Sequence, residues 1–207
     1  MIDRHRDAIA AAHMFARQAA DTPRVLIILG TRGVGKTSLV RSIVVEASAE
    51  GRRRIQVFSA SDLAFQMAEA VRRGTCESIP DWFRRGDVVA IEELCDLRRR
   101  PATLEAIGRM IARWTVAGAC VVGTAACSLQ EITAFERRLP KPPTSHVVML
   151  ATPTRREMRL VVKSLANTNN LRIDARTVAD IAAWCDGDIR RAVGAIRQLQ
   201  FEARLRP

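Results

Sequence analysis

Residues 25–38 read VLIILGTRGVGKTS, and more can be inferred from this stretch than from any other part of the chain. Its first residues, Val25 to Leu29, form an apolar run that is too short for a helix and β-branched enough for a buried strand. Gly30 to Thr37 fit the pattern G-x-x-x-x-G-K-[ST] at every defined position, and Ser38 to Ala49 have the pattern of a helix. A buried strand, a glycine-rich turn and a helix in this order predict a phosphate-binding loop.

The residue types in this loop suit close contact between backbone and phosphate. Glycines let the N–H groups of the turn point together at phosphate oxygens, because no side chain obstructs them. Lys36, one of three lysines in a chain with thirty arginines, puts a compact ammonium where it reaches the β- and γ-phosphates, and the Thr37 hydroxyl holds Mg²⁺. We therefore predict that a nucleoside triphosphate is bound by Thr31, Arg32, Gly33, Val34, Gly35, Lys36, Thr37 and Ser38.

Along the first three quarters of the chain, apolar runs typical of strands alternate with helical patterns. We predict strands at residues 25–29, 55–59, 87–91, 119–124 and 147–150, and helices at 4–20, 38–49, 62–73 and 102–116. Strands that alternate with helices imply a parallel sheet covered on both faces. We therefore predict an α/β nucleotide-binding domain over residues 1–151, with a parallel sheet flanked by helices.

The pattern changes at Thr152-Pro153, after which only helices follow. Thr152 suits an N-cap and Pro153 the first helical position. Further helices are predicted at residues 153–167, 175–185 and 189–204, with Asp174 and Asp188 as the N-caps of the last two. We predict a small all-helical domain over residues 152–207.

Two carboxylates follow the strand predicted at residues 87–91. Beside the strand of the phosphate loop, this strand would bring Glu92 to the metal and Glu93 to the attacking water as the polarising base. The alternative is a solvated turn, because Glu-Glu-Leu-Cys-Asp also suits the opening of a loop.

The composition favours a polyanionic partner. The net charge is +11 and the isoelectric point is near 10.9, which indicates nucleic acid as the partner. The alternative is a codon bias toward arginine, since the arginines fall in scattered pairs and triplets rather than in one block.

The sequence also disfavours membrane-spanning, secreted, disulfide-stabilised and zinc-binding proteins. No apolar run approaches the 18 or so residues of a membrane span, and residues 1–17 lack the apolar stretch of a secretory signal. We therefore expect a cytoplasmic protein without a membrane partner. Five cysteines, an odd number without C-x-x-C spacing, argue against a disulfide framework or a zinc site.

Taken together, the motifs resemble those of an AAA+ ATPase, and more closely those of the ATPase domain of the bacterial replication initiator DnaA and its relatives. Gly30 to Thr37 resembles the Walker A motif and Val88 to Glu93 the Walker B motif. Val57 to Leu63 is similar to the segment that carries the initiator-specific element, and Ala119 to Thr124 to the sensor I strand. The resemblance spans nearly the whole chain and implies a P-loop NTPase sheet followed by a helical lid.

Two arginines acquire roles from this resemblance. Phe135 to Leu139 resembles the box whose arginine reaches into the neighbouring subunit's nucleotide site, which makes Arg138 the finger acting in trans, with Arg137 as the alternative. Gly187 to Val193 resembles the sensor II helix of the lid, and Arg190 falls at its phosphate-facing arginine. The other interpretation of both is surface charge on an arginine-rich chain.

The sequence also departs from the family pattern. Glu92 stands where the family usually has aspartate, and Thr124 is followed by two alanines where the family places a polar residue on the γ-phosphate. The segment Leu139 to Ser145 is longer and richer in proline than the family's turn. The first two of these departures, at Glu92 and after Thr124, predict slow hydrolysis. The resemblance covers the ATPase core and neither the double-stranded DNA-reading domain nor the helicase-docking domain of a full initiator.

The resemblance implies a DnaA-like protein that binds ATP or ADP with Mg²⁺ and acts in replication initiation or its regulation. It also implies self-association or a DnaA-type AAA+ partner, and contact with DNA, including single-stranded DNA. The sequence leaves two alternatives open: a nucleotide-gated adaptor with little hydrolysis, and a transposition-helper or signalling ATPase. A small-molecule kinase is disfavoured, because the helical lid offers no evident acceptor site.

Overall fold

The computed structural model describes residues 5–18, 22–51, 54–74, 87–97, 100–126, 130 and 145–205. The chain divides into two compact units. The first, here called the sheet unit, comprises Arg6–Gly30 and Lys36–Met149; the second, the helical unit, comprises Met1–His5, Thr31–Gly35 and Leu150–Pro207. Five residues of the phosphate loop therefore group with the helical unit, although the strand before them and the helix after them belong to the sheet unit.

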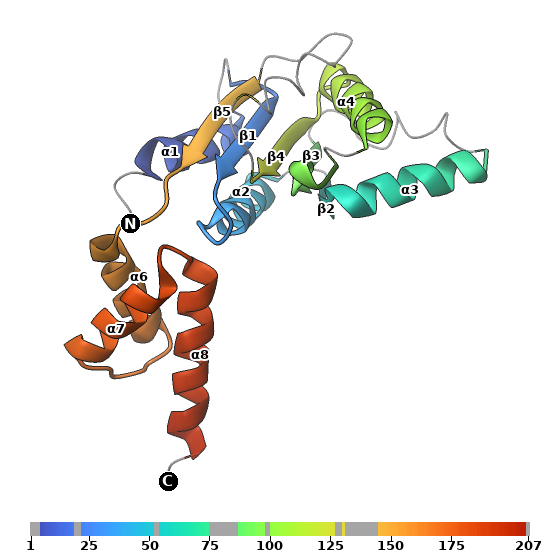
Figure 1. The fold of residues 1–207 in the computed structure, drawn as a ribbon. Coiled ribbons are helices and arrows are strands. Elements are labelled where there is room, and N and C mark those ends of the chain that lie inside the picture. Colours follow the sequence, from blue (N-terminus) through green and yellow to red (C-terminus); the bar gives the residue numbers. More distant parts are fainter. Residues whose placement is uncertain are drawn as a thin grey trace. The chain divides into compact units, whose positions relative to one another are not determined.

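Five strands form one sheet in the order β2-β3-β4-β1-β5 (Figure 1). Their bounds are β1 (Val25–Gly30), β2 (Arg54–Ser59), β3 (Asp87–Glu92), β4 (Cys120–Ala125) and β5 (Ser145–Leu150). The pairs β2–β3, β3–β4 and β4–β1 are parallel, so these four strands end at the same edge of the sheet. The prediction of a parallel sheet flanked by helices is confirmed.

Helices cover both faces of the sheet. They are α1 (Arg6–Arg17), α2 (Lys36–Ala49), α3 (Ala60–Arg72) and α4 (Pro101–Val116), with a short 3₁₀ helix, η3 (Leu94–Leu97), after β3. Alternate strand residues such as Val25 and Ile27 share a hydrophobic core with α3, η3 and α4. Since successive side chains of a strand point to opposite faces, Leu26 and Ile28 face the other way, and α1 and α2 pack against β1.

The helical unit is built on α6 (Arg155–Thr168), α7 (Ala175–Cys185) and α8 (Ile189–Leu205), which pack against one another (Figure 1). Each helix contributes buried residues spaced three or four apart, so one stripe of each faces a common core. The members are Met158, Val162 and Ala166 of α6, Ala182 and Cys185 of α7, and Ala192 and Ile196 of α8.

One predicted helix start is wrong. Helix α6 has Thr154 as its N-cap, not Thr152, and Pro153 precedes the cap instead of opening the helix. The reason is a capping box: the Glu157 N–H donates to the Thr154 hydroxyl (3.3 Å), and the Thr154 N–H donates to the Glu157 carboxylate (2.8 Å). Thr152 cannot form this pair, because the residue three positions on is Arg155.

The N-caps predicted for α7 and α8 are confirmed. The Thr177 N–H donates to Asp174 Oδ1 (2.6 Å), and the Arg190 N–H donates to Asp188 Oδ1 (2.8 Å). Between the two helices, Asp186 and Gly187 have φ angles of 45° and 82°, so the chain leaves α7 through the left-handed conformation that ends many helices.

Cysteine chemistry differs from the expectation at one position. Cys120 and Cys185 are free and buried, whereas Cys95 is disulfide-bonded. Spacing alone gave no sign of this bond, because it depends on which segments the fold brings together. In the described part of the chain, no helix is both long and apolar enough to cross a membrane.

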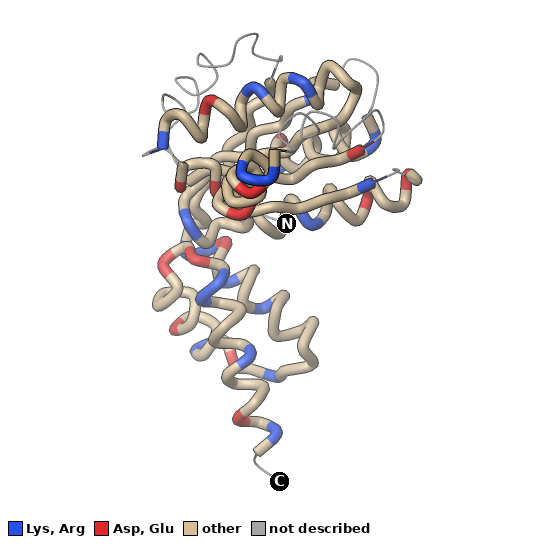
Figure 2. Tube along the Cα trace, turned by 90° about the vertical axis from the view of Figure 1, so that its right-hand side faces the viewer, with Lys and Arg blue, Asp and Glu red and all other residues tan. Residues whose placement is uncertain are grey.

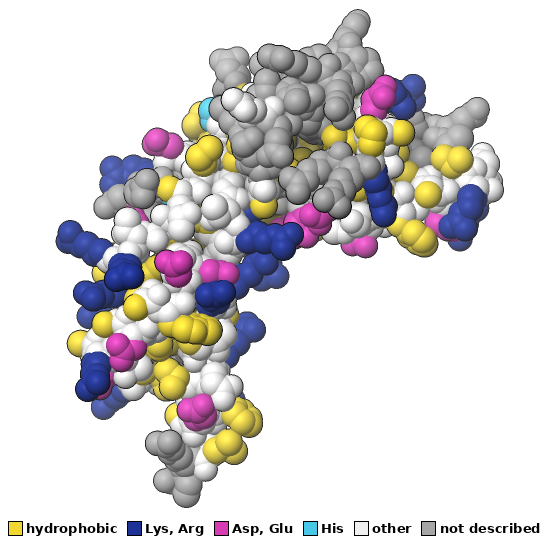
Figure 3. All heavy atoms as spheres, in the orientation of Figure 1, with side chains coloured by type: hydrophobic (Ala, Val, Ile, Leu, Met, Phe, Trp, Pro, Cys, Tyr) yellow, Lys and Arg dark blue, Asp and Glu magenta, His cyan; other side chains and the backbone are white. Residues whose placement is uncertain are grey.

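Basic residues are distributed along the helices of both units (Figure 2). On the face of the helical unit seen in Figure 3, Lys and Arg side chains lie among apolar and acidic ones. The described cations therefore follow the scattered pattern of the sequence.

Candidate functional site

The phosphate loop joins β1 to α2. Lys36, the first residue of α2, donates a hydrogen bond from Nζ to the Gly30 carbonyl at the end of β1 (2.8 Å). The half-buried Thr37 and the exposed Ser38 follow in the first turn of α2, which contains no acidic residue. Because the N–H groups of a helix's first turn lack intrahelical partners, this turn can bind an anion.

The loop itself is shaped by its glycines. Gly33 and Gly35 have φ angles of 78° and 107°, where residues with a Cβ are strained. At Gly33 there is also no space for a side chain, because an added Cβ would overlap the Asp188 carboxylate. The Gly33 carbonyl accepts a hydrogen bond from the Ile189 N–H (2.9 Å), and the Thr31 and Thr152 hydroxyls are 3.1 Å apart. Within the helical unit, the loop is therefore tied to the start of α8.

Glu93 is held in an unusual backbone conformation. Its φ of 62° is left-handed, which is uncommon for a residue with a side chain. Its N–H donates to the Thr124 hydroxyl at the end of β4 (3.0 Å), and its carbonyl accepts from the Asp96 N–H in η3 (2.9 Å). Thr124 is buried, whereas the Glu93 side chain is exposed. The backbone of Glu93 is fixed on both sides while its carboxylate faces outward.

Glu92 has an oxygen that no described donor satisfies. The residue ends β3, and its Oε1 is buried without a hydrogen-bond partner in the described part of the structure. A buried polar atom without a partner costs about 1–3 kcal/mol, and more when it carries charge. A cation bound at this oxygen would remove that cost. Mg²⁺ commonly binds to one or two carboxylates plus substrate phosphates, so the position suits a Mg²⁺ ligand.

The sheet places these groups at one edge of the sheet unit. β4 lies between β1 and β3. Thr124, near the end of β4, is therefore flanked by the end of β1, which leads to Lys36, and by the end of β3, which carries Glu92. In the helical unit, Arg190 is exposed at the start of α8, with its N–H bonded to Asp188. Arg137 and Arg138 lie outside the described residues.

Two residues of this region were not predicted to act as they do. The resemblance assigns Thr124 to the end of the sensor I strand and gives it no role of its own, yet its hydroxyl accepts the hydrogen bond that supports the backbone of Glu93. Asp188 was predicted only as a helix cap, yet its carboxylate also lies against Gly33. For Thr124, the available signal in the sequence was a threonine at the end of a buried strand. The contact between Asp188 and Gly33 has no local signal in the sequence.

The family model of the bacterial DnaA ATPase domain matches residues 3–146. The chain belongs to the DnaA ATPase-domain family. It is 24% identical over 202 residues to the chromosomal replication initiator protein DnaA of Lactococcus lactis subsp. cremoris, covering 97% of this chain. The match covers 44% of that relative, so the chain spans less than half the length of the curated protein.

Solved structures of the family share the fold. Domain III of the Thermotoga maritima replication initiation protein DnaA aligns with a TM-score of 0.81 at 16% identity, over 99% of this chain and 86% of that one. A replication initiator DnaA bound to AMPPCP and single-stranded DNA aligns with a TM-score of 0.79 at 17% identity, over 97% of this chain and 62% of that one. At these identities the matches establish the shared fold alone.

Proposed function

We propose that this DnaA-family ATPase domain binds ATP or ADP with Mg²⁺ and hydrolyses ATP slowly. The main observation behind the proposal is the complete phosphate loop. Lys36 at its end donates a hydrogen bond to the carbonyl of Gly30 at its start, and the N-terminus of α2 directly follows the loop. A DnaA structure that contains AMPPCP, an ATP analogue, supports the choice of nucleotide.

Individual residues take separate parts in this proposal. Residues 31–38 hold the phosphates, and Thr37 and Glu92 hold Mg²⁺, which neutralises charge on the β- and γ-phosphates when bound. Glu93 polarises the attacking water as a general base, with its backbone held by Thr124. Arg190 contributes positive charge from the lid, and Arg138 of a neighbouring molecule contributes it in trans.

We propose that residues 1–151 form the nucleotide-binding domain and 152–207 the lid, and that the protein acts in replication initiation or its regulation. Nucleotide binding would order the loop and the start of α8 together, because the Gly33 carbonyl accepts from the Ile189 N–H. Self-association or a DnaA-type partner would supply Arg138. Single-stranded DNA bound to a DnaA relative and the net charge of +11 support contact with DNA.

A nucleotide-gated adaptor with little hydrolysis is the second candidate. After Thr124, β4 ends in Ala125 and is followed by Ala126, whose methyl groups offer no hydrogen bond to a γ-phosphate. This observation favours slow turnover, and the two candidates differ only in whether turnover is measurable.

The test is titration of a fluorescent ATP analogue into the parent protein and two variants. Lys36→Ala should weaken binding at least tenfold, because a charge-assisted contact contributes about 1.5–3 kcal/mol. Arg41→Ala removes an exposed cation from α2 and should bind as the parent does. Equal affinity in Lys36→Ala would overturn the assignment. Phosphate release with Mg²⁺ then separates an ATPase from an adaptor.

A further inference from the structure

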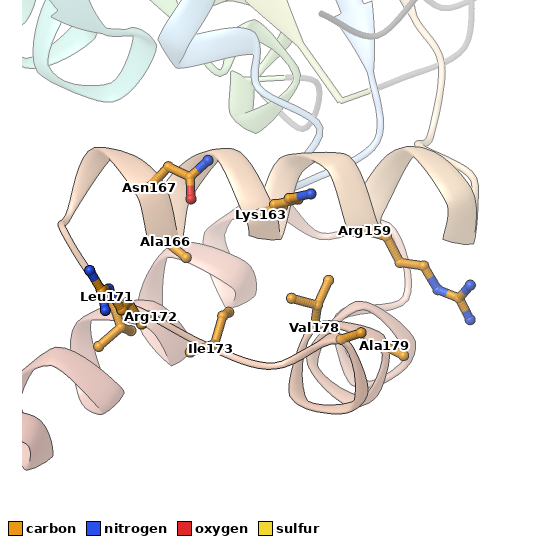
Figure 4. Close-up of a pocket in the computed structure, with 10 residues that line it drawn as sticks. Arg159, Lys163, Ala166, Asn167, Leu171, Arg172, Ile173, Val178 and Ala179 are labelled. Atoms are coloured by element: carbon orange, nitrogen blue, oxygen red, sulfur yellow. The ribbon is translucent and has the colours of Figure 1, made fainter.

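The helical unit contains a hollow of about 520 Å³ between α6, α7 and the segment that joins them (Figure 4). Its floor is apolar and is formed mainly by the side chains of Ala166, Leu171, Ile173 and Val178. Ala166 is buried, and the other three are half-buried and pack against the core of the unit. We call this hollow the α6–α7 groove.

The rim of the groove is basic. Arg159, Lys163 and Arg172 line it and are exposed, with Arg159 and Arg172 at opposite ends and Lys163 between them in Figure 4. None of the lining residues is acidic, and within the described part of the chain none of these three cations pairs with a carboxylate. The acids two residues from Arg159 and Arg172 both cap helices: the Glu157 carboxylate accepts from the Thr154 N–H, and Asp174 Oδ1 accepts from the Thr177 N–H at the start of α7.

This arrangement is not explained by the stability of the fold. Arg159 and Lys163 are four residues apart on α6, a spacing at which like charges destabilise a helix. The half-buried aliphatic side chains below them retain exposed apolar area that burial under a partner would remove from water. Both unfavourable features disappear when an anionic and partly apolar group fills the groove.

The lining residues discriminate between classes of partner. A single-stranded nucleic acid is commonly held by aromatic rings that stack on its bases, and none of the lining residues is aromatic. An apolar floor offers nothing to a bare phosphodiester backbone. A peptide helix with apolar side chains on one face and carboxylates along its edge matches the aliphatic floor and the cationic rim together.

We propose that the α6–α7 groove binds an acidic amphipathic helix of a partner protein. The apolar face of that helix lies on the floor, and its carboxylates face Arg159, Lys163 and Arg172. The proposal is independent of nucleotide binding, since every residue that carries it lies in 159–179 of the helical unit.

The probe is a fluorescently labelled peptide with Leu at positions i, i+3, i+4 and i+7 and Glu at the flanking positions. Its controls are a peptide of the same composition in scrambled order and one with Lys in place of each Glu. The chain of residues 1–207 should bind the first peptide, with an affinity that falls as salt rises. Backbone NMR shifts should move for residues of α6 and α7 that line the groove.

Variants then locate the site. Arg159→Glu combined with Lys163→Glu should weaken binding of the acidic peptide at least tenfold and allow binding of the Lys peptide. Both side chains are exposed, so the fold should survive. The matched control, Arg156→Glu, changes an exposed cation of α6 that does not line the groove and should leave the affinity within twofold of the parent value.

Three outcomes would overturn the proposal. They are absence of peptide binding at millimolar concentration, equal binding of the scrambled peptide, and equal binding by the doubly reversed variant. Single-stranded DNA and vesicles containing anionic lipid are tested in parallel. If the double reversal abolishes binding of either one while the peptide does not bind, the groove belongs to that partner instead.

Discussion

The Glu93 N–H donates a hydrogen bond to the Thr124 hydroxyl, with 3.0 Å between N and Oγ1. This bond links the residue after β3 to the end of the neighbouring strand β4. Glu93 has a φ of 62°, and a left-handed conformation costs a residue with a side chain about 1–2 kcal/mol. The hydrogen bond offsets part of that cost and fixes the backbone that presents the Glu93 carboxylate.

Thr124→Val should therefore slow ATP turnover without a matching loss of ATP affinity. Valine has nearly the shape of threonine but cannot accept the hydrogen bond, so the Glu93 backbone loses its support. We expect kcat to fall about tenfold, equivalent to about 1.4 kcal/mol, with a change in ATP affinity below twofold. Steady-state phosphate release and nucleotide titration measure the two quantities.

Thr124→Ser is the matched control, because it keeps the hydroxyl and should restore most of the turnover. A purely structural role for Thr124 would lower the thermal midpoint of both variants in proportion to their activity. Thr124→Val turnover equal to that of the parent would show that Glu93 does not depend on this bond.

Substitution of Glu92 and substitution of Glu93 should have different effects on the stabilisation by Mg²⁺. Glu92→Gln should abolish the additional thermal stabilisation that Mg²⁺ gives over ATP alone, because Oε1 is the oxygen left for a cation. Glu93→Gln should keep that stabilisation and lose turnover, since an amide is no base. Chelation of Mg²⁺ should make the parent behave like Glu92→Gln. Thermal shifts that remain unchanged in Glu92→Gln would place the metal elsewhere.

Most of the secondary structure could be predicted from local patterns. The strand predicted at 87–91 is β3 (Asp87–Glu92), and the helix predicted at 175–185 has the observed bounds of α7. These signals are local, because a short apolar run or a cap involves residues close together in the chain. The strand order β2-β3-β4-β1-β5 could not be derived in this way, since it depends on pairing between distant segments.

In the candidate site, too, local patterns predicted some residues, whereas contacts between distant residues could not be predicted. The sequence predicts Lys36 and Thr37 as ligands of phosphate and Mg²⁺ because their spacing from the glycines is a local pattern. It predicts Glu92 as a Mg²⁺ ligand because this residue ends an apolar run. The bond between Glu93 and Thr124 and the contact between Gly33 and Asp188 join residues far apart in sequence. Only the folded chain reveals such contacts. The catalytic and binding roles stay predictions until the variants are measured.

The N-cap of α7 should make the helical unit sensitive to acid. The hydrogen bond from the Thr177 N–H holds the pKa of Asp174 below its ordinary value. A lowered pKa in the folded state means that the carboxylate stabilises the fold above the unfolded pKa of about 3.9, and that this contribution is lost as the pH falls through the folded value. Asp174→Asn keeps a neutral cap that does not titrate.

At neutral pH the parent should therefore be more stable than Asp174→Asn, and the difference should shrink as the pH falls below about 4. Thermal unfolding followed by circular dichroism across that range measures it. A difference that persists unchanged in acid would show that the Asp174 charge contributes nothing to stability.

Arg138, placed by family resemblance, should act across a subunit boundary. Arg138→Ala retains an intact phosphate loop, and Lys36→Ala retains an intact arginine. In related GTPases an arginine supplied in trans raises the rate by roughly 10³–10⁵, so a mixture of the two variants should regain turnover that neither shows alone. Absence of complementation between folded, associating variants would reject the role in trans, and Arg137→Ala in place of Arg138→Ala tests the neighbouring arginine.

Asp188 combines two functions that oppose each other when a nucleotide binds. Its Oδ1 caps α8 by accepting from the N–H groups of Arg190 (2.8 Å) and Arg191 (3.3 Å). The same carboxylate lies against Gly33 in the phosphate loop, where its charge would repel an anionic ligand. The cap orders the start of α8, whose Ile189 N–H binds the Gly33 carbonyl, so the residue both supports the loop and opposes its ligand.

Substitution by asparagine separates the two effects, because asparagine caps a helix about as well as aspartate and carries no charge. We expect Asp188→Asn to bind ATP more tightly than the parent, and the gain should shrink as salt rises because it is electrostatic. Asp188→Ala loses the cap as well, so its thermal midpoint should fall. Weaker binding by Asp188→Asn would mean that the carboxylate supports the loop more than its charge repels the phosphates, and the electrostatic explanation would then be wrong.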